Sequence, residues 1–123
     1  MERDTRQRRA IRTALEESGR PLSTQEVLQL ARQTSPSLGT ATVYRTLKSL
    51  VEEGWLAVVD VPGEAPRYER AGKDHHHHFH CRGCGRLFEL EGCPDGLRHL
   101  TPQGFSLEAH EVVLYGRCTV CTA

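Results

Sequence analysis

The chain has no excess of charge of either sign and no long apolar run. Its 123 residues carry 16 lysines and arginines against 16 aspartates and glutamates, which gives a formal net charge of zero. That balance argues against a generally basic nucleic-acid-binding protein. No apolar stretch approaches the roughly 20 residues that cross a membrane. The start, Met1-Glu2-Arg3-Asp4, is polar, so we expect no signal peptide, no membrane span and a soluble, cytoplasmic protein.

Enzyme motifs are also missing from the sequence. No HExxH or other hydrolase motif occurs, and the CxxC pairs do not lie in a thioredoxin-like βαβ pattern. A chain of this length suits one average domain or two lobes of about 60–70 residues. Lobes of that size bury little core, so a structural metal or a partner subunit would help them to fold.

One stretch of the chain is rich in metal ligands. Residues 74–85, DHHHHFHCRGCG, contain five of the seven histidines and two of the five cysteines. Imidazole and thiolate groups bind borderline metals such as Zn²⁺, Fe²⁺ and Mn²⁺. The run is internal and only four of its histidines are consecutive, so it is not a purification tag.

The first half predicts three helices and a two-stranded hairpin. The helices are expected from a cap at Asp4 or Thr5 to about Glu17, from the capping box at residues 23–26 to about Gln33, and from a cap at Thr40 to about Glu53. Strands are expected over residues 55–61 and 67–70, with a loop containing proline and glycine between them. This order is typical of a winged helix, which we place at residues 1–70.

The third expected helix is amphipathic. Its buried stripe comprises Val43, Leu47, Leu50 and Val51. The opposite face has side chains that can bond base edges and phosphates, namely Thr42, Tyr44, Arg45, Lys48 and Ser49. A solvated face is the alternative for this helix alone, and some winged helices bind proteins instead. Five arginines among residues 1–12, against two carboxylates, add a weak indication of phosphate contact. The whole pattern favours DNA binding.

A second lobe is expected at residues 75–123, after a polar hinge at residues 71–74. We expect strands at about His75–Cys81, Arg86–Glu91 and Phe105–Tyr115, and a short helix near Pro94–Thr101. The predicted fold class is therefore α+β, with an N-terminal winged-helix lobe and a small C-terminal α/β lobe.

Two CxxC pairs predict a structural Zn²⁺ site. The pairs are Cys81-x-x-Cys84 and Cys118-x-x-Cys121. Each pair can turn two thiolates toward one ion, and four sulfurs make a closed tetrahedral site. Gly83 and Gly85 allow the tight backbone that such a turn needs. The 33 intervening residues exceed the usual zinc-ribbon spacing, so the metal would tie the end of the lobe to its start.

The histidines divide between two faces if residues 75–81 form a strand, because successive side chains point to opposite sides. One face then has His75 and His77, and the other has His76, His78 and His80. Glu69 and Glu89 could complete a metal site with His76 and His78. His110, with Cys93 or Glu91, could join His75 and His77. An ordinary surface or core histidine is the alternative for any single one, and a buried free thiol is the alternative for Cys93.

Three motifs in order resemble the ferric uptake regulator family. They are Ala41-Thr42-Val43-Tyr44-Arg45-Thr46-Leu47, the histidine run into Cys81-Arg82-Gly83-Cys84-Gly85, and Leu114-Tyr115-Gly116-Arg117-Cys118-x-x-Cys121. The resemblance spans about Thr5 to Cys121. It implies a bacterial metal-dependent repressor, a homodimer with a C-terminal dimerisation lobe and no small-molecule substrate. A dimer predicts a palindromic operator in double-stranded DNA. The resemblance further implies that Tyr44 and Arg45 contact DNA and that the four paired cysteines hold zinc.

The regulatory site of the family matches this sequence in part. Glu69, His76, His78 and Glu89 match ligands of its inter-lobe sensing site, but Pro21 stands where the family has a fifth ligand, a histidine. A second family site is matched by His75, His77 and His110, and its acidic fourth ligand falls near Glu91 or Cys93. His80 stands where an apolar residue is commoner. Fe²⁺, Zn²⁺ and Mn²⁺ stay open as regulatory metals. Peroxide sensing has the least support, since it needs the missing histidine.

We therefore expect a metal-gated repressor of metal-homeostasis genes, not an enzyme. Metal would join Glu69 of the first lobe to ligands of the second and lock the dimer in the operator-binding conformation. A zinc-dependent hydrolase is one rival, because histidine and glutamate clusters can supply an open coordination position and a general base. A metal buffer or chaperone is another rival, and it would leave the winged helix without a role.

Overall fold

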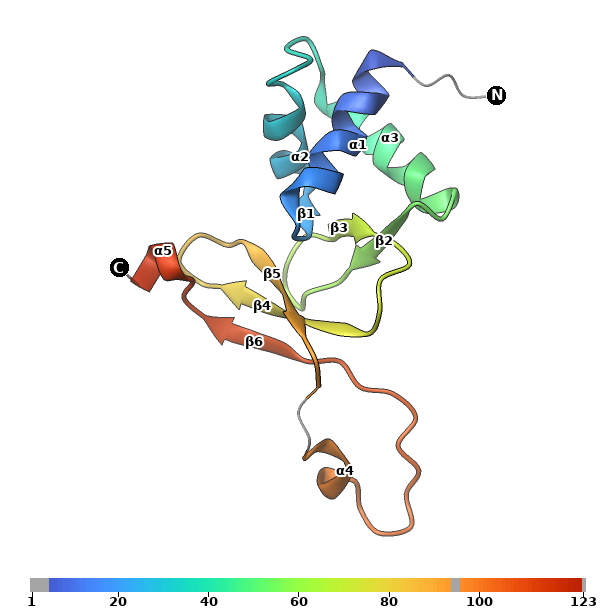
Figure 1. Ribbon diagram of the computed structural model, residues 1–123, viewed down its shortest axis with the longest axis vertical. Helices are drawn as coiled ribbons and strands as arrows, with labels where there is room; N and C mark the ends of the chain where they lie inside the picture. The colour runs from blue at the N-terminus through green and yellow to red at the C-terminus, as the bar shows by residue number, and fades with distance from the viewer. Residues whose placement is uncertain (1–4, 94–95, 123) are drawn as a thin grey trace. The chain divides into compact units, whose positions relative to one another are not determined.

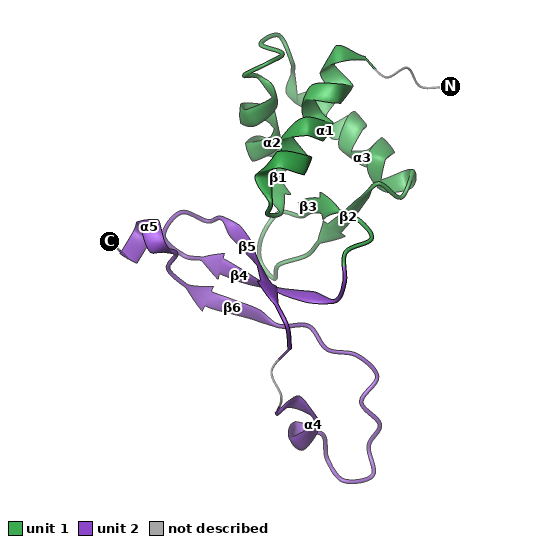
Figure 2. Cartoon of the chain, in the orientation of Figure 1, with its two compact units in different colours: residues 1–73 green, residues 74–123 purple. Residues whose placement is uncertain are grey.

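The structure, a computed structural model, describes residues 5–93 and 96–122. The chain divides into two compact units, Met1–Lys73 and Asp74–Ala123 (Figure 1, Figure 2). The elements of the first are α1 Arg6–Ser18, β1 Leu22–Ser23, α2 Thr24–Ala31, α3 Thr40–Glu52, β2 Leu56–Val59 and β3 Arg67–Arg70. Those of the second are β4 His76–Cys81, β5 Leu87–Glu91, α4 Leu97–Leu100, β6 Val113–Gly116 and α5 Thr119–Thr122. The expected α+β class is confirmed.

The first helix, α1, begins with a side-chain cap. The Thr5 hydroxyl oxygen accepts a hydrogen bond from the backbone N–H of Arg8 at 3.1 Å. The other expected cap, Asp4, lies outside the described residues. The helix ends at Gly19, whose φ of 66° is the left-handed conformation that glycine adopts without strain. The buried face of α1 consists of Ala10, Ile11, Ala14 and Leu15.

A capping box fixes the start of α2. The Ser23 hydroxyl accepts from the Glu26 N–H at 3.2 Å, and the Glu26 carboxylate accepts from the Ser23 N–H at 3.0 Å. Arg20 forms an ion pair with the same carboxylate at 2.6 Å. Burial raises the pKa of Glu26, but the hydrogen bonds from Ser23 and Arg20 outweigh it and leave the pKa below its ordinary value. The helix ends at Ala31, slightly earlier than expected.

Replacing Ser23 with alanine should lower the free energy of unfolding of the first unit by about 1 kcal/mol, because the Glu26 N–H loses its acceptor. Thermal and urea unfolding, followed by circular dichroism, would measure the loss. Ser37→Ala is the matched control, since Ser37 is exposed in a turn, and it should change stability by less than about 0.5 kcal/mol. Equal losses in the two variants would contradict the role of the cap.

The third helix, α3, is the last helix of the first unit and precedes its hairpin. Its N-cap is Gly39, with no side-chain hydrogen bond, and Thr40 is already helical, so the expected cap at Thr40 is wrong. Threonine is common both at a cap and in the first turn, and the sequence does not separate the two positions. The predicted stripe is buried at Val43, Leu47 and Leu50, and partly buried at Val51.

The hairpin after α3 forms the wing. β2 and β3 pair antiparallel, with Val58 opposite Tyr68, and β2 is shorter than the expected strand over residues 55–61. The additional strand β1 pairs Leu22 with Tyr68, which gives the strand order β1-β3-β2. Two residues are too few to show a strand period, which is why β1 is not predicted from the sequence.

The core of the first unit is apolar and fully enclosed. Its most buried members, all 0% exposed, are Ile11, Leu22, Val27, Leu38, Val43 and Leu47. Trp55 packs against this core, and two guanidinium groups flank its ring, Arg70 at 3.9 Å and Arg12 at 5.1 Å from the centroid. Arg70 also donates to the Trp55 carbonyl. These contacts fasten the end of β3 to α1 and to the start of the wing.

The second unit is built on a sheet of order β5-β4-β6. β4 pairs antiparallel with β5 and parallel with β6, where His78 lies opposite Val113. Within the described part of this unit, the buried side chains are few, namely His77, Cys81 and Leu87. Apolar burial within one chain therefore contributes little to the stability of this unit.

Two elements of the second unit differ from the expectation. The strand expected over Phe105–Tyr115 is confined to β6 at Val113–Gly116. Because β6 runs parallel to β4, the residues before it would extend past the start of β4 and find no partner. The helix expected near Pro94–Thr101 is α4, at Leu97–Leu100, and residues 94–95 lie outside the described part. The sequence does not predict α5.

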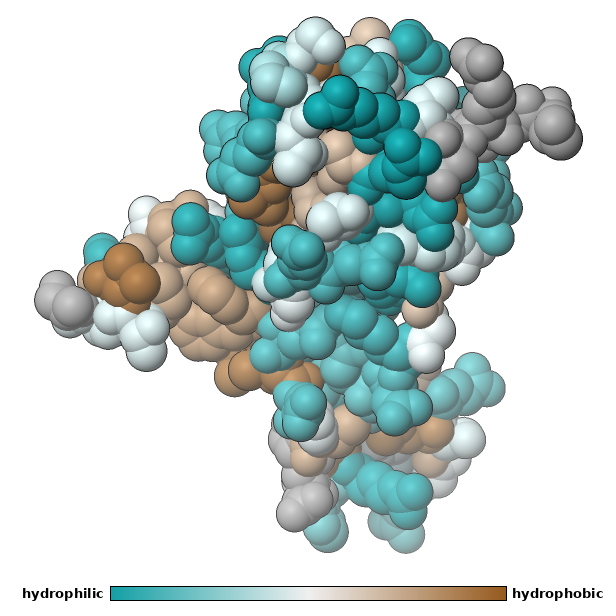
Figure 3. All heavy atoms as spheres, turned by 45° about the horizontal axis from the view of Figure 1, so that its top comes forward, coloured by the Kyte–Doolittle hydropathy of each residue, from teal (hydrophilic) through white to brown (hydrophobic). Residues whose placement is uncertain are grey.

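Several large apolar side chains of the second unit are exposed. Leu100 and Val120 are each 78% exposed, Phe105 is 71% exposed and Leu114 is 50% exposed. Apolar surface, brown in Figure 3, appears over this unit. So many large apolar side chains left exposed in one small unit indicate an interaction surface.

Candidate metal centres and DNA-binding surface

Four cysteines of the second unit converge on one point. Cys81 ends β4, Cys84 lies in the turn before β5, Cys118 follows β6 and Cys121 lies in α5. Their sulfur atoms all lie within 4.8 Å of one another. All five cysteines of the chain are described, and each is a free thiol. Four sulfurs at this separation fit a tetrahedral Zn²⁺ ion, which binds thiolate at about 2.3 Å.

The backbone around Cys81 favours its thiolate form. The N–H groups of Cys84 and Cys118 donate to Cys81 Sγ at 3.4 Å and 3.3 Å. These hydrogen bonds lower the pKa of Cys81 to about 5. The pKa of Cys121 is raised to about 12 because its thiol can donate a hydrogen bond to the neighbouring sulfurs, Cys81 first, and this stabilises its protonated form. The cluster therefore holds protons that a bound dication would displace.

Gly83 stands where a side chain has no room. A Cβ at this position would lie 2.7 Å from Sγ and 2.8 Å from Cβ of Cys121. Gly83→Ala should therefore displace Cys121 and weaken zinc binding by about 10-fold or more. Competition for zinc against a chromophoric chelator would measure this. Gly96→Ala is the matched control, since a Cβ at Gly96 meets nothing within 4 Å, and similar zinc affinities for the two variants would contradict the explanation.

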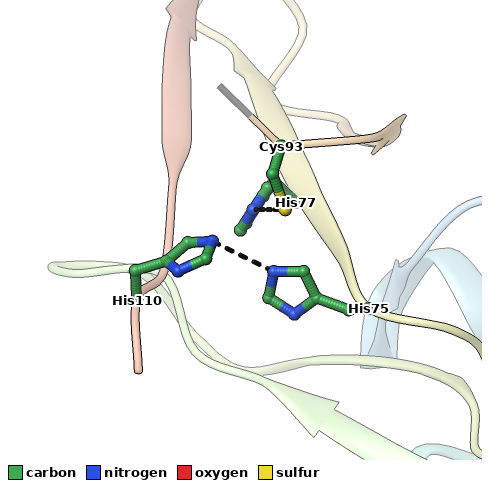
Figure 4. Close-up of side chains that lie close together, drawn as sticks. All are labelled: His75, His77, Cys93 and His110. Carbon is green, nitrogen blue, oxygen red and sulfur yellow. Dashed lines mark hydrogen bonds between the residues drawn. The ribbon is translucent and has the colours of Figure 1, made fainter. Parts of the chain in front are cut away.

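A second cluster comprises His75, His77, Cys93 and His110, whose ligand atoms also lie within 4.8 Å of one another (Figure 4). His75 Nε2 lies 3.1 Å from His110 Nε2, and His77 Nε2 lies 3.4 Å from Cys93 Sγ. The structure brings Cys93 to these histidines, whereas Glu91 pairs opposite a histidine of the other face. Cys93 is exposed, so its alternative role as a buried free thiol is wrong.

His77 is the buried member of this second cluster, at 3% exposure. Burial, followed by the neighbouring His75 and His110, lowers the pKa of His77 below its ordinary value. The ring is therefore neutral at physiological pH. Neutral imidazole is the form that binds a metal ion, because a protonated ring offers no lone pair.

The other face of β4 has His76 and His78, with ring centroids 4.9 Å apart. His76 Nδ1 donates to the carbonyl oxygen of Asp74 at 2.8 Å, which leaves Nε2 as the nitrogen suited to a metal. Glu89 pairs opposite His78, so the two side chains share this face. Glu69 lies on β3 of the first unit, and its role as a ligand stays a prediction.

The outer face of α3 is polar and exposed. Tyr44 is 56% exposed, Arg45 and Lys48 are exposed, and Thr42 is half-buried. Arg45 donates to the Thr42 hydroxyl at 3.3 Å, so the threonine helps to position the guanidinium. Beside this face lies a hollow of about 540 Å³, lined by Tyr44, Arg45, Lys48, Val51, Glu52, Val58 and Tyr68.

Two polar residues of the first unit are already engaged within it. Arg8 forms a two-pronged ion pair with Glu53, at 2.8 Å and 2.6 Å. Ser49 donates to the same carboxylate at 2.8 Å. Ser49 therefore contributes to packing between α1 and α3. The contact of Arg8 with Glu53 could not be predicted from the sequence, because the partners are 45 residues apart and only the fold joins them, whereas Ser49 and Glu53 are four residues apart along α3.

A winged helix in the same chain as clusters of cysteine and histidine ligands defines a class of protein, the regulators that bind DNA in response to metal. The ferric uptake regulator family matches residues 2–115. The chain belongs to this family, and it is a metal-responsive transcriptional regulator. The expectation that it is not an enzyme agrees with a family of regulators. Among the described residues, no helix is long and apolar enough to cross a membrane.

The proteins similar to this chain are named as regulators of the uptake of different metals. The zinc uptake regulation protein of Mycobacterium tuberculosis is 35% identical over 122 residues, which is 97% of this chain and 94% of that protein. The ferric uptake regulation protein of Campylobacter jejuni is 33% identical over 123 residues, 95% of this chain and 78% of that protein. A solved structure of a zinc-bound manganese uptake regulator has a TM-score of 0.81 at 29% identity, and the match covers 95% of this chain and 91% of that one.

Proposed function

We propose that the chain is a metal-gated repressor that binds palindromic operator DNA as a homodimer. The outer face of α3 supports DNA binding, because its exposed tyrosine, arginine and lysine suit base edges and phosphates. We assign the DNA contacts to Thr42, Tyr44, Arg45 and Lys48. Two such helices in a dimer would bind two half-sites about one turn of DNA apart. Action on operator DNA would place the protein in the cytoplasm.

We assign the four-sulfur cluster to structural zinc. Its supporting observation is the convergence of Cys81, Cys84, Cys118 and Cys121 within 4.8 Å, with backbone N–H groups directed at Cys81. A closed set of four thiolates leaves no coordination position for a substrate, which favours a structural role over a hydrolytic one. A bound Zn²⁺ there would hold α5 against the end of β4.

We assign the regulatory metal to Glu69, His76, His78 and Glu89. The support is the shared face of the two histidines and Glu89, and the Nε2 of His76 that its bond to Asp74 leaves for a metal. A metal that takes ligands from both units would restrict the motion between them, and so reduce the ordering cost of binding DNA. Pro21, where the family has a histidine, offers no ligand, so this site would use four protein ligands rather than five.

The exposed apolar side chains of the second unit support a homodimer. Leu100, Phe105 and Val120 are each more than 70% exposed in the single chain. Burying them against a second copy would stabilise a unit that has little core of its own. The second unit would then hold the two winged helices together.

The experiment that tests this function is a gel shift on palindromic promoter DNA with each of Zn²⁺, Fe²⁺ and Mn²⁺, and with a chelator. The proposal expects a shift that requires metal and that Arg45→Ala abolishes while the variant stays dimeric. A shift that does not depend on metal would contradict the gating. No shift with any metal would favour a zinc hydrolase or a metal buffer, which peptide or ester hydrolysis assays would then separate.

A further inference from the structure

The cluster of His75, His77, Cys93 and His110 contains no carboxylate. Three imidazoles and one thiol converge within 4.8 Å, and no acidic residue of the described chain belongs to this group (Figure 4). We infer that this cluster is a regulatory site selective for Zn²⁺ over Mn²⁺ and Fe²⁺, and that Cys93 sets the selectivity. The inference rests on the proposed metal-gated function and adds a second regulatory site, with its own metal, to the site on the other face of β4.

The selectivity for Zn²⁺ follows from the donor atoms of the cluster, which are one sulfur and three imidazole nitrogens. Thiolate and imidazole ligands favour Zn²⁺, whereas Mn²⁺ prefers carboxylate, carbonyl and water oxygens. One thiolate and three neutral rings complete a tetrahedral shell, the geometry that Zn²⁺ takes most readily. The ligands proposed on the other face include the carboxylates of Glu69 and Glu89. Because Mn²⁺ and Fe²⁺ also bind carboxylates, that site would discriminate less among these metals. The thiolate of Cys93 is the ligand that would make its own cluster prefer Zn²⁺.

The ligands come from three segments of the chain, and three of the four ligands lie outside the paired strands. His75 immediately precedes β4 and His77 lies within it, Cys93 lies just beyond β5, and His110 lies in the segment without strand structure before β6. Cys93 and His110 also line a hollow of about 640 Å³ together with the exposed Phe105. Zinc bound at the cluster would fasten this segment to the sheet. It would thereby order apolar surface that the proposed dimer contact needs.

One hydrogen bond would report on occupancy of the cluster. The N–H of Val112 donates to Nδ1 of His77 at 3.3 Å, and Nε2 of the same ring faces Cys93. A metal on Nε2 moves the ring proton to Nδ1, and a metal on Nδ1 takes the lone pair directly. The bond from Val112 must open in either case. Val112 immediately precedes β6, and its carbonyl accepts from the His78 N–H at 3.2 Å.

Cobalt is the probe for the thiolate ligand, because Zn²⁺ has no visible spectrum. Full-length protein with zinc in its four-cysteine site is titrated with Co²⁺. Wild type should develop a thiolate-to-cobalt charge-transfer band and the visible bands of tetrahedral Co²⁺. Cys93→Asp keeps a ligand but removes the sulfur, so it should lose the charge-transfer band. Its zinc affinity should fall by about 10-fold or more, and its manganese affinity should not fall.

The controls separate Cys93 from the other ligands. His76→Ala removes a ligand of the opposite face and should retain the band. Cys93→Ser is a second variant with a smaller change of shape, and it too should lose the band. Cys93 is exposed, so circular dichroism should show that both variants fold. Amide exchange at Val112 should speed up when zinc binds to wild type, and in Cys93→Asp the same change should require a zinc concentration about 10-fold higher or more. A wild type without the band, or a band that persists in Cys93→Asp, would overturn the assignment.

Operator gel shifts with the same variants distinguish this inference from the proposed function. Wild type should respond to Zn²⁺ at a concentration about 100-fold or more below that required for Mn²⁺, and Cys93→Asp should reduce this ratio at least about 10-fold. Metal-dependent DNA binding without the cobalt band would leave the function intact and remove the selectivity. The band without metal-dependent DNA binding would keep the site and remove the function.

Discussion

Cys118→Ser should unfold the second unit while the first unit keeps its structure. The described part of residues 74–123 buries few side chains, and a unit of about 50 residues rarely gains more than a few kcal/mol from its core. A structural zinc site contributes about 10–16 kcal/mol in small zinc domains. Cys118 is only partly buried, so its replacement tests the metal site more cleanly than replacement of the fully buried Cys81.

Hydrogen–deuterium exchange would locate this loss. Peptides from residues 74–123 should lose protection in Cys118→Ser, those from residues 5–73 should keep it, and the dimer should dissociate. Cys93→Ser is the matched control, because it removes a thiol outside the four-sulfur cluster and should leave β4 and β5 protected. Retained protection throughout the second unit of Cys118→Ser, with its zinc removed, would show that the metal is not what stabilises this unit.

The first unit could be predicted almost element by element, because its determinants are local. The reciprocal bonds of Ser23 and Glu26 and the helical spacing of Val43 and Leu47 are both visible in the sequence. Their burial is also complete within one chain. β1 could not be predicted, because its strand character exists only through its pairing with Tyr68.

The second unit was harder to predict, because part of what shapes it lies beyond local sequence. Phe105 and Leu107 alternate with polar residues as in a strand, yet both are exposed and unpaired with β4 in the described chain. Alternation indicates that one face is covered, and it does not say by what. A second copy of the chain, as proposed, would supply that cover.

The candidate sites, too, could be predicted from the sequence only where local sequence determines them. The period of a strand correctly separates His75 and His77 from His76 and His78. The choice between Glu91 and Cys93 could not be made from the sequence. The intervening Gly92 has a φ of 83°, a turn that ends the strand alternation before Cys93. His80, without a predicted role, packs edge-on against Tyr115 with ring centroids 5.7 Å apart.

His76→Ala and Glu69→Gln should each lower metal-stimulated operator binding by about 100-fold or more. Each removes one ligand from a proposed site of four, and even indirect partners of a metal typically contribute 10–100-fold to its affinity. The metal would then no longer favour the operator-binding conformation, because a ligand shifts an equilibrium only by its difference in affinity for the two states. Structural zinc content and the dimer should both be unchanged, since neither residue belongs to the four-sulfur cluster.

Fluorescence anisotropy on labelled operator DNA, titrated with each metal, would measure this loss, and mass spectrometry of the native protein would check zinc and dimer. His99→Ala and Glu17→Gln are matched controls, because both residues are exposed and lie outside every ligand cluster of the described chain. Both controls should respond to metal as wild type does. If His76→Ala also does so, gating does not pass through this face of β4. If Glu69→Gln alone does so, the metal binds within the second unit and must act on DNA binding through the dimer rather than by joining the two units.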